Sequence, residues 1–251
     1  MMWQKRFKLL TFNEIDSTNS EALRLAKLGV TYNHVIWAES QTGGRGRYGR
    51  IWHSKPGNLY MSILLQSDEF FQSQSQLSFV ASLSVYEAIQ TMANEQNIAL
   101  NMRLKWPNDI VIDVVKASGI LLESIKYNNR QYLVIGIGIN VNDAPVLQDR
   151  KTTSLCEVKL HASVRDVLDS VMNSFMTYYD LWLNEGFLKI RELWLAQSYA
   201  LGEMVTFTDG ANIIEGTFID IDANGSIRLK LSSGQIYTNN SGEVFFLFFS
   251  A

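Results

Sequence analysis

Apolar positions along the chain follow two patterns, one with helical spacing and one of short extended runs. The helical spacing is clearest at Leu77, Ala81, Val85, Ala88 and Met92. It predicts an amphipathic helix over about 76–96. Capping patterns predict helices over 18–28 and 164–184, the first from the capping box 18–21 and a C′ glycine at position 29. A fourth helix is expected over roughly 188–198.

Extended runs rich in β-branched and aromatic residues predict the strands. In the first part of the chain they cover 8–12, 34–39, 59–66, 103–106, 110–113, 120–127 and 132–140. After about Ala200 they follow closely, over 204–208, 213–220, 226–231, 235–238 and 244–249. Asn224-Gly225 is a strong hairpin signal there. The mixture predicts an α+β fold with a first domain over 1–200 and a small β-barrel over 201–251.

The bulk composition of the 251 residues narrows the class of protein. Hydrophobic residues make up 47%, enough for a sizeable core, and the net charge of −3 is opposite to that of a general nucleic-acid binder. A single cysteine excludes an internal disulfide, and three scattered histidines match no Cys/His metal spacing. We find no signal peptide and no run of ~20 apolar residues, so we expect a cytoplasmic protein without a membrane partner.

The loop 43–50 carries the most informative chemistry. It packs four glycines and three arginines into eight residues. Glycine lets the backbone approach a ligand closely, and the planar guanidinium of arginine matches carboxylate and phosphate oxygens. The loop is therefore suited to wrapping an anion. A Gly/Arg tract that binds nucleic acid is the alternative, but such tracts are repeated and lie in basic chains.

Four further segments carry candidate chemistry. The run 103–109 places a lysine, a rigid Trp-Pro corner, an amide and a carboxylate together, although an ordinary surface turn explains it equally well. In 116–123 a lysine comes just before an apolar strand with a glycine at its mouth. The run 135–142 lacks the third glycine of a dinucleotide fingerprint, so we expect a strand whose glycines admit a ligand or another chain. The run 16–19 is a helix cap that also exposes hydroxyls and amides.

In their order and spacing these segments resemble the biotin protein ligases of bacteria. The resemblance spans 16–142 and rests on DSTN, GRGRYGR with a following tryptophan, GNLY, KWPND, KASGIL and GIGINVN. It implies a catalytic biotin/ATP-binding domain over 1–200, with a mixed β-sheet flanked by helices, related to class II aminoacyl-tRNA synthetases and lipoate ligases. It also implies that 201–251 is an SH3-like β-barrel.

The resemblance assigns roles residue by residue. The catalytic candidates are Arg47, Lys116, Lys105 and Asp109. The biotin-binding candidates are Ser17, Thr18, Asn19, Gln41, Gly44, Arg45 and Gly119. The ATP- or adenylate-binding candidates are Arg47, Arg50, Trp52, Lys116 and Asn140. Joining a carboxylate to ATP brings two anions together, and the cations of these sets are suited to neutralising both.

The implied activity is a two-step ligation. Biotin and MgATP would form biotinyl-5′-AMP and pyrophosphate, and biotin would pass to a lysine of an acceptor domain such as biotin carboxyl carrier protein. The implied cofactors are ATP and Mg²⁺, with biotin as substrate. No side-chain cluster forms a metal site, so Asp109 is expected either to lie near Mg²⁺ or to help deprotonate the incoming amine.

Only fifteen residues precede Asp16, too few for a helix-turn-helix. We therefore expect the monofunctional type, without DNA binding, and with a homodimer as one option for its assembly. A lipoate ligase is the first alternative function. A non-enzymatic nucleic-acid-binding module is the second and less favoured one.

Overall fold

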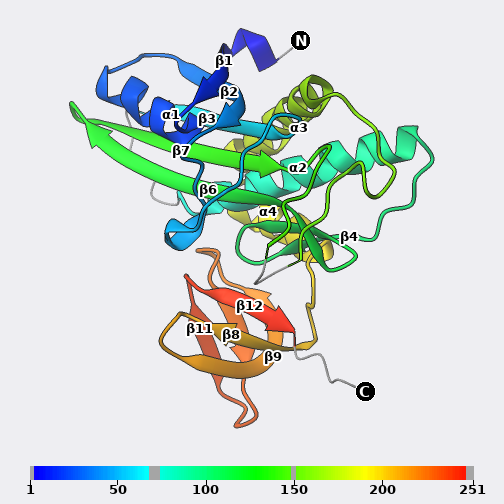
Figure 1. Ribbon diagram of the computed structural model, residues 1–251. Helices are drawn as coiled ribbons and strands as arrows, with labels where there is room; N and C mark the ends of the chain where they lie inside the picture. Colours follow the sequence, from blue (N-terminus) through cyan, green and yellow to red (C-terminus); the bar gives the residue numbers. More distant parts are fainter. Residues whose placement is uncertain (1–2, 68–73, 148–150, 247–251) are drawn as a thin grey trace.

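The computed structural model describes residues 3–67, 74–147 and 151–246 (Figure 1). A seven-stranded sheet forms the centre of the larger domain, in the order β1-β2-β3-β7-β6-β5-β4. Its first two strands are parallel, and every other neighbouring pair is antiparallel. The expected α+β class with a mixed sheet is confirmed.

The bounds of the elements agree with the expected ones to within a few residues, with one exception at β6. The strands of the large sheet are β1 (Phe7–Ile15), β2 (Asn33–Gln41), β3 (Leu59–Ser67), β4 (Met102–Lys105), β5 (Asp109–Ile112), β6 (Val115–Tyr127) and β7 (Arg130–Ile139). The helices are α1 (Thr18–Lys27), α2 (Gln76–Glu95), α3 (Val164–Glu185) and α4 (Phe187–Ala196), and short 3-10 turns cover Trp3–Lys5 and Arg47–Gly49.

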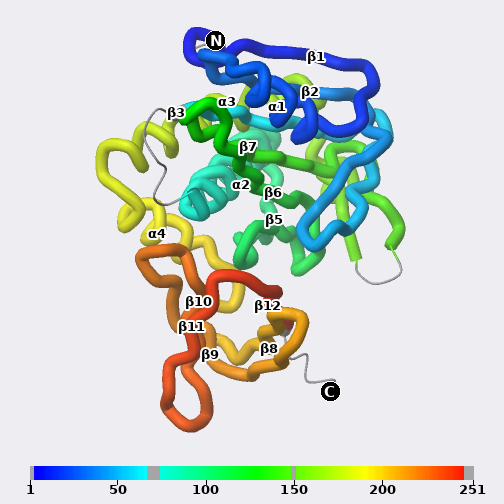
Figure 2. Tube along the Cα trace, turned by 90° about the vertical axis from the view of Figure 1, so that its left-hand side faces the viewer, coloured from blue at the N-terminus to red at the C-terminus, as the bar shows by residue number. Residues whose placement is uncertain are grey.

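The C-terminal sheet is antiparallel and has the order β11-β10-β9-β8-β12, as expected for an SH3-like domain. Its strands are β8 (Met204–Thr208), β9 (Ile213–Ile221), β10 (Ile227–Lys230), β11 (Ile236–Asn239) and β12 (Glu243–Phe246). The last strand was expected over 244–249, of which 247–249 lie outside the described residues. Both views place this sheet at one end of the larger domain, below α4 and β5 (Figures 1 and 2).

The two faces of the large sheet carry different layers. On β3, Met61 and Ile63 point into the main core, which includes α2 and α3, whereas Leu64 packs with Ala22 and Ala26 of α1. This alternation follows from the period of two along a strand. The α1 face therefore has a small apolar cluster at one end and polar residues beyond it.

The start of α1 differs from the expected capping box. Ser17, not Thr18, is the N-cap residue, and its Oγ accepts a hydrogen bond from the backbone N–H of Ser20 at 3.4 Å. Thr18 instead donates its backbone N–H to the side chain of Gln41 at 2.8 Å. A tertiary partner thus satisfies an N–H that the helix leaves unpaired. Gly29 follows the helix with φ of 70°, as expected for a C′ glycine.

The start of β6 also differs, because the strand begins five residues before the expected position. Lys116 and Gly119 consequently lie inside the strand, where β5 pairs with it. Asp113 and Val114, at φ of 48° and 63°, form the turn between the two strands. Valine rarely adopts positive φ, so the sequence carries no turn signal there. A register shift places Ile110 opposite Ser118 and Val111 opposite Lys116, a β-bulge beside the lysine.

Candidate functional site

Three glycines form a floor on the α1 face of the large sheet, and we call them the glycine floor. They are Gly119 on β6 with Gly136 and Gly138 on β7, and Gly119 pairs with Gly138 across the strands. A Cβ atom at Gly136 would lie 2.3 Å from Oδ1 of Asn19, and one at Gly138 would lie 2.5 Å from the indole of Trp52. The expected close approach is therefore made by two side chains of the same chain.

A chain of hydrogen bonds joins the start of α1 to β2 and β3. Ser62 is fully buried, and its Oγ lies 2.6 Å from Oδ1 of Asn19 and 2.8 Å from Oγ1 of Thr18. Oγ1 of Thr18 lies 3.2 Å from Oε1 of Gln41, whose Nε2 donates to Oγ of Ser54 at 2.9 Å. The structure thus brings three of the biotin-binding candidates together around one edge of the floor.

Arg45 lies on the same side and is held by Glu123 of β6. Nη2 of Arg45 is 3.1 Å and 3.0 Å from the two carboxylate oxygens, and its Nη1 donates to Oγ of Ser20 at 2.8 Å. Nδ2 of Asn19 donates to Glu123 Oε2 at 2.7 Å. The sequence-based analysis did not single out Glu123 or Ser62. The available signal for Glu123 was its place as the one charge between Lys116 and Lys126.

A second ion pair lies at another edge of the floor. Nζ of Lys116 donates to Oδ1 of Asp109 at 2.6 Å, and both side chains are about a fifth exposed, at 20% and 21%. The same ammonium lies 5.5 Å from the centre of the Trp52 ring. Nε1 of Trp52 is buried without a hydrogen-bond partner among the described residues. Two of the catalytic candidates are therefore in direct contact beside the tryptophan that covers the glycines.

The loop 43–50 is tied to the large domain at its first residues. Gly43 donates its N–H to the backbone oxygen of Asp16 at 2.7 Å. A Cβ atom at Gly44 would lie 2.5 Å from Oγ of Ser54, so the close approach of backbone there requires glycine.

The Arg24 guanidinium binds the Asp16 carboxylate and lowers its pKa to about 2.

The tip of the loop points away from the floor and contacts the C-terminal domain. Arg47 donates to the backbone oxygen of Gly242 at 3.1 Å, and Arg50 forms an ion pair with Glu243. The hydroxyls of Tyr48 and Ser241 are 3.2 Å apart. Two of the adenylate-binding candidates thus lie against the segment 241–243. No local signal marked this segment, because it is almost two hundred residues away in the sequence.

Two further candidates, Asn140 and Lys105, have side-chain contacts with other segments. Asn140 is 2% exposed, and its Nδ2 donates to the backbone oxygen of Thr153 at 3.0 Å. Nζ of Lys105 lies 5.3 Å from the centre of the Phe245 ring. In this structure Asn140 connects β7 to the segment around Thr153, and Lys105 faces the C-terminal domain.

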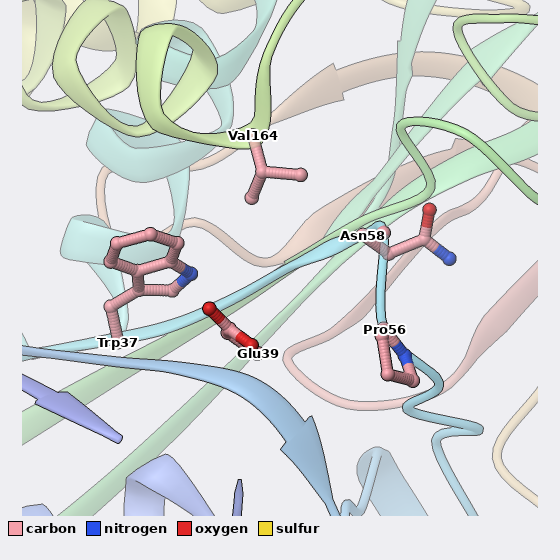
Figure 3. A pocket seen from close by; sticks show the side chains of 6 residues that line it. Trp37, Glu39, Pro56, Asn58 and Val164 are labelled. Atoms are coloured by element: carbon pink, nitrogen blue, oxygen red, sulfur yellow. The ribbon is translucent and has the colours of Figure 1, made fainter. Parts of the chain in front are cut away.

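A cavity of about 160 Å³ lies elsewhere on the large domain. Its lining residues are Trp37, Glu39, Pro56, Gly57, Asn58 and Val164, none of them a candidate site residue (Figure 3). Trp37 packs against the main core rather than the α1 cluster, which separates the cavity from the glycine floor. We therefore do not assign this cavity to the candidate site.

Two further kinds of feature, a metal site and a membrane-spanning helix, are considered together. Within 3–67, 74–147 and 151–246, no three acidic, histidine or cysteine side chains gather as a metal site would require. In the same ranges no helix combines the length and the apolar character that crossing a bilayer demands.

Comparison with known proteins defines the class first. Residues 12–140 match the Biotin/lipoate A/B protein ligase family, and residues 200–247 match the Biotin protein ligase C terminal domain. The glycine floor and its two ion pairs lie within the first match. The small antiparallel sheet lies within the second.

Individual relatives narrow the class. The biotin–[acetyl-CoA-carboxylase] ligase of Paracoccus denitrificans is 32% identical over 238 residues, covering 92% of this chain and 97% of the relative. The bifunctional ligase/repressor of Bacillus subtilis is 33% identical, covering 90% of this chain and 70% of the relative. The structure of the Aquifex aeolicus biotin protein ligase in complex with biotin and ATP has a TM-score of 0.79 at 32% identity and covers 94% of this chain and 97% of the other. The chain belongs to the biotin protein ligase family.

Proposed function

We propose that this chain activates biotin with MgATP and transfers it to a lysine of an acceptor domain, such as biotin carboxyl carrier protein. The observation that carries the proposal is the glycine floor, with a network of mostly neutral hydrogen-bonding groups at one edge and the Lys116–Asp109 pair at another. A floor without side chains leaves space for a ring system against the backbone. One edge of the floor offers neutral hydrogen-bonding groups and the other offers charges, so the two edges suit different ends of a ligand.

The neutral edge suits the ureido group of biotin. Thr18, Asn19 and Gln41 combine hydroxyl and amide groups, which serve as donors and acceptors. Ser17, Gly44 and Arg45 flank them, and Gly119 belongs to the floor itself. An apolar dithiolane ring would offer these polar groups no hydrogen bond of its own, which favours biotin over lipoate.

The charged edge suits the carboxylate and the α-phosphate. A carboxylate oxygen of biotin forms a bond to the α-phosphorus, and the bond from phosphorus to the bridging oxygen breaks, so pyrophosphate leaves. Lys116 is placed to stabilise the negative charge of this step. In the ligand-free chain Asp109 already neutralises the ammonium, so binding requires Lys116 to exchange that partner for the phosphate.

Asp109 fits Mg²⁺ as a single carboxylate rather than as part of a complete protein site. Mg²⁺ in nucleotide-using enzymes is commonly held by one or two carboxylates, phosphate oxygens and water. When bound, Mg²⁺ supplies charge neutralisation at the phosphate oxygens. In the second step the acceptor amine attacks the acyl carbon and AMP leaves, and Asp109 is placed to help remove the amine proton.

Binding of the ring requires Trp52 to move, because its indole now lies on Gly119 and Gly138. Trp52 is two residues after the loop 43–50, so a change in the loop can displace it. We propose that Trp52, Arg47 and Arg50 contact the nucleotide after this rearrangement, with Asn140 and Lys105 at the periphery. A closed loop would exclude water from the mixed anhydride.

The test is direct. Wild-type protein is incubated with Mg²⁺, ATP and either biotin or lipoate, and the adenylate is identified by its mass. Biotinyl-5′-AMP is expected, and it should be consumed when a biotin-acceptor domain is added. Lipoyl-AMP as the main product would favour the first alternative, and the absence of any adenylate would overturn the enzymatic proposal.

The nucleic-acid alternative meets a structural objection. Arg45 and Arg50 are ion-paired with glutamates, so two of the three arginine charges of the loop are already neutralised within the chain. Filter binding of RNA over a range of salt concentrations tests this point. Binding that weakens steeply as salt rises would restore the alternative.

A further inference from the structure

Glu123 connects two of the proposed biotin-binding residues, although it has no assigned role in the segment 116–123. Its carboxylate accepts hydrogen bonds from Nη2 of Arg45 and Nδ2 of Asn19. Arg45 also donates to Ser20, so its guanidinium is held from two sides. The side chains of Arg45 and Glu123 are 32% and 27% exposed, which places the pair at the border of the site rather than in bulk solvent.

The site contains two cations close to the floor, and a substrate carboxylate can be attracted to either. Lys116 and Arg45 carry the same charge, but their carboxylate partners differ in how firmly they are held. If Asp109 turns to Mg²⁺, its ion pair with Lys116 breaks. Lys116 is then available to bind the substrate carboxylate. Glu123 is held by both Arg45 and Asn19. Arg45 therefore remains neutralised while Lys116 becomes available.

We propose that Glu123 is a positioning residue that holds Arg45 and Asn19, shields the Arg45 charge from the substrate carboxylate and so sets the direction in which the acid lies. The inference rests on the proposed function, since it concerns the same site. With Glu123 in place, the carboxylate of biotin is drawn to Lys116 and its ureido group to the Asn19 edge. Without the negative charge of Glu123, Arg45 competes with Lys116 for the biotin carboxylate. A fraction of the biotin molecules then binds in the reversed orientation.

The experiment compares two ligands that differ only at the acid group. Dissociation constants are measured for biotin and for its alcohol analogue in the wild type and in Glu123→Gln, with Mg²⁺ and an ATP analogue that cannot react at the α-phosphorus. The substitution keeps the shape of the side chain and removes its charge. Because a hydrogen bond to a charged group is a strong one, the preference for biotin over the alcohol should rise about tenfold in the variant. The rate of biotinyl-5′-AMP formation at saturating biotin should fall, because a reversed acid cannot react.

Two further variants separate positioning from a structural role. The double variant Arg45→Gln/Glu123→Gln removes the competing cation as well, so the preference between the two ligands should return to the wild-type value. Glu123→Asp keeps the charge and should retain the wild-type preference even if both ligands bind more weakly. Glu192→Gln removes a carboxylate from an exposed ion pair with Lys189 on α4 and serves as the matched control.

The outcomes divide cleanly. A raised preference for biotin that the double variant cancels supports the proposal. Equal weakening of both ligands, or no change in either, overturns it and leaves Glu123 with a structural role or none. If wild-type protein binds biotin and forms the adenylate, such a result affects this inference alone. Failure of the wild type to bind biotin would overturn the proposed function and this inference with it.

Discussion

The two halves of the loop 43–50 are held by different parts of the molecule. The inner half is tied to the large domain through the backbone of Asp16 and through Glu123 beside the glycine floor. The outer half contacts the C-terminal domain through the Ser241 hydroxyl, the backbone oxygen of Gly242 and the Glu243 carboxylate. An exposed ion pair contributes only about 0–1 kcal/mol. The outer half can therefore leave its partner at little cost, whereas the inner half stays in place and keeps the site in shape.

The largest effect is expected beside the inner half. Lys116→Ala should lower the rate of pyrophosphate release by about 10²–10³, because one preorganised electrostatic contact to the reacting phosphate is lost. The thermal unfolding temperature should change little, since the lysine contributes charge rather than packing. Lys189→Ala on α4 is the control. If Lys116→Ala releases pyrophosphate at a near-normal rate, Lys116 takes no part in the reaction, and the contrast between the two halves of the loop is weakened.

A smaller effect is expected when the floor itself is filled. Gly138→Ala introduces a Cβ atom 2.5 Å from the indole of Trp52, so the ring must shift. Overpacking of this kind costs about 1–3 kcal/mol, which corresponds to a loss of roughly 5- to 150-fold in biotin affinity if the ring site is spoiled. Calorimetry measures the change. Gly46→Ala in the loop is the matched control, because the nearest atom to its added Cβ is 3.8 Å away. Equal affinities for the two variants would contradict the assignment of the floor.

Arg47→Gly tests the outer half. We expect biotinyl-5′-AMP to dissociate about tenfold faster, because a charged hydrogen bond to the adenylate is lost and the loop gains freedom. Escaped adenylate reacts with lysines of other proteins, so an avidin blot of serum albumin in the reaction should darken. Unchanged labelling together with an unchanged off-rate would show that Arg47 serves only the contact with the C-terminal domain.

The smallest effect is expected from the ion pair that joins the domains. Glu243→Gln leaves Arg50 without a charged partner and should raise hydrogen exchange at 47–50 by no more than about fivefold, in line with the energy of a surface pair. Exchange at 43–45 should not change. High salt should reproduce the effect in the wild type by screening the pair. Faster exchange spread evenly over both halves would show that the loop behaves as one unit.

Most elements were predictable because their signals are local. Helical periodicity located α2, and the Asn224-Gly225 signal located the β9–β10 hairpin. The start of β6 was missed because its preceding turn contains Val114 at positive φ, where a glycine or asparagine is typical. The N-cap of α1 was misplaced because Gln41, which lies 23 positions from Thr18, satisfies a backbone N–H at the helix start.

The sequence by itself determined the candidates for the chemistry, which are the glycines of β6 and β7, the arginines of the loop, Asp109 of β5 and Lys116 of β6. Only the tertiary structure decided how those charges are paired. Arg45 meets Glu123 across 78 positions, and Arg50 meets Glu243 across 193. Composition and periodicity report the environment of neighbouring residues, whereas the partner of an ion depends on where the sheet and the C-terminal domain bring distant segments together. For this reason the loop could be recognised from the sequence as a cationic segment, but its division into an inner and an outer half could not.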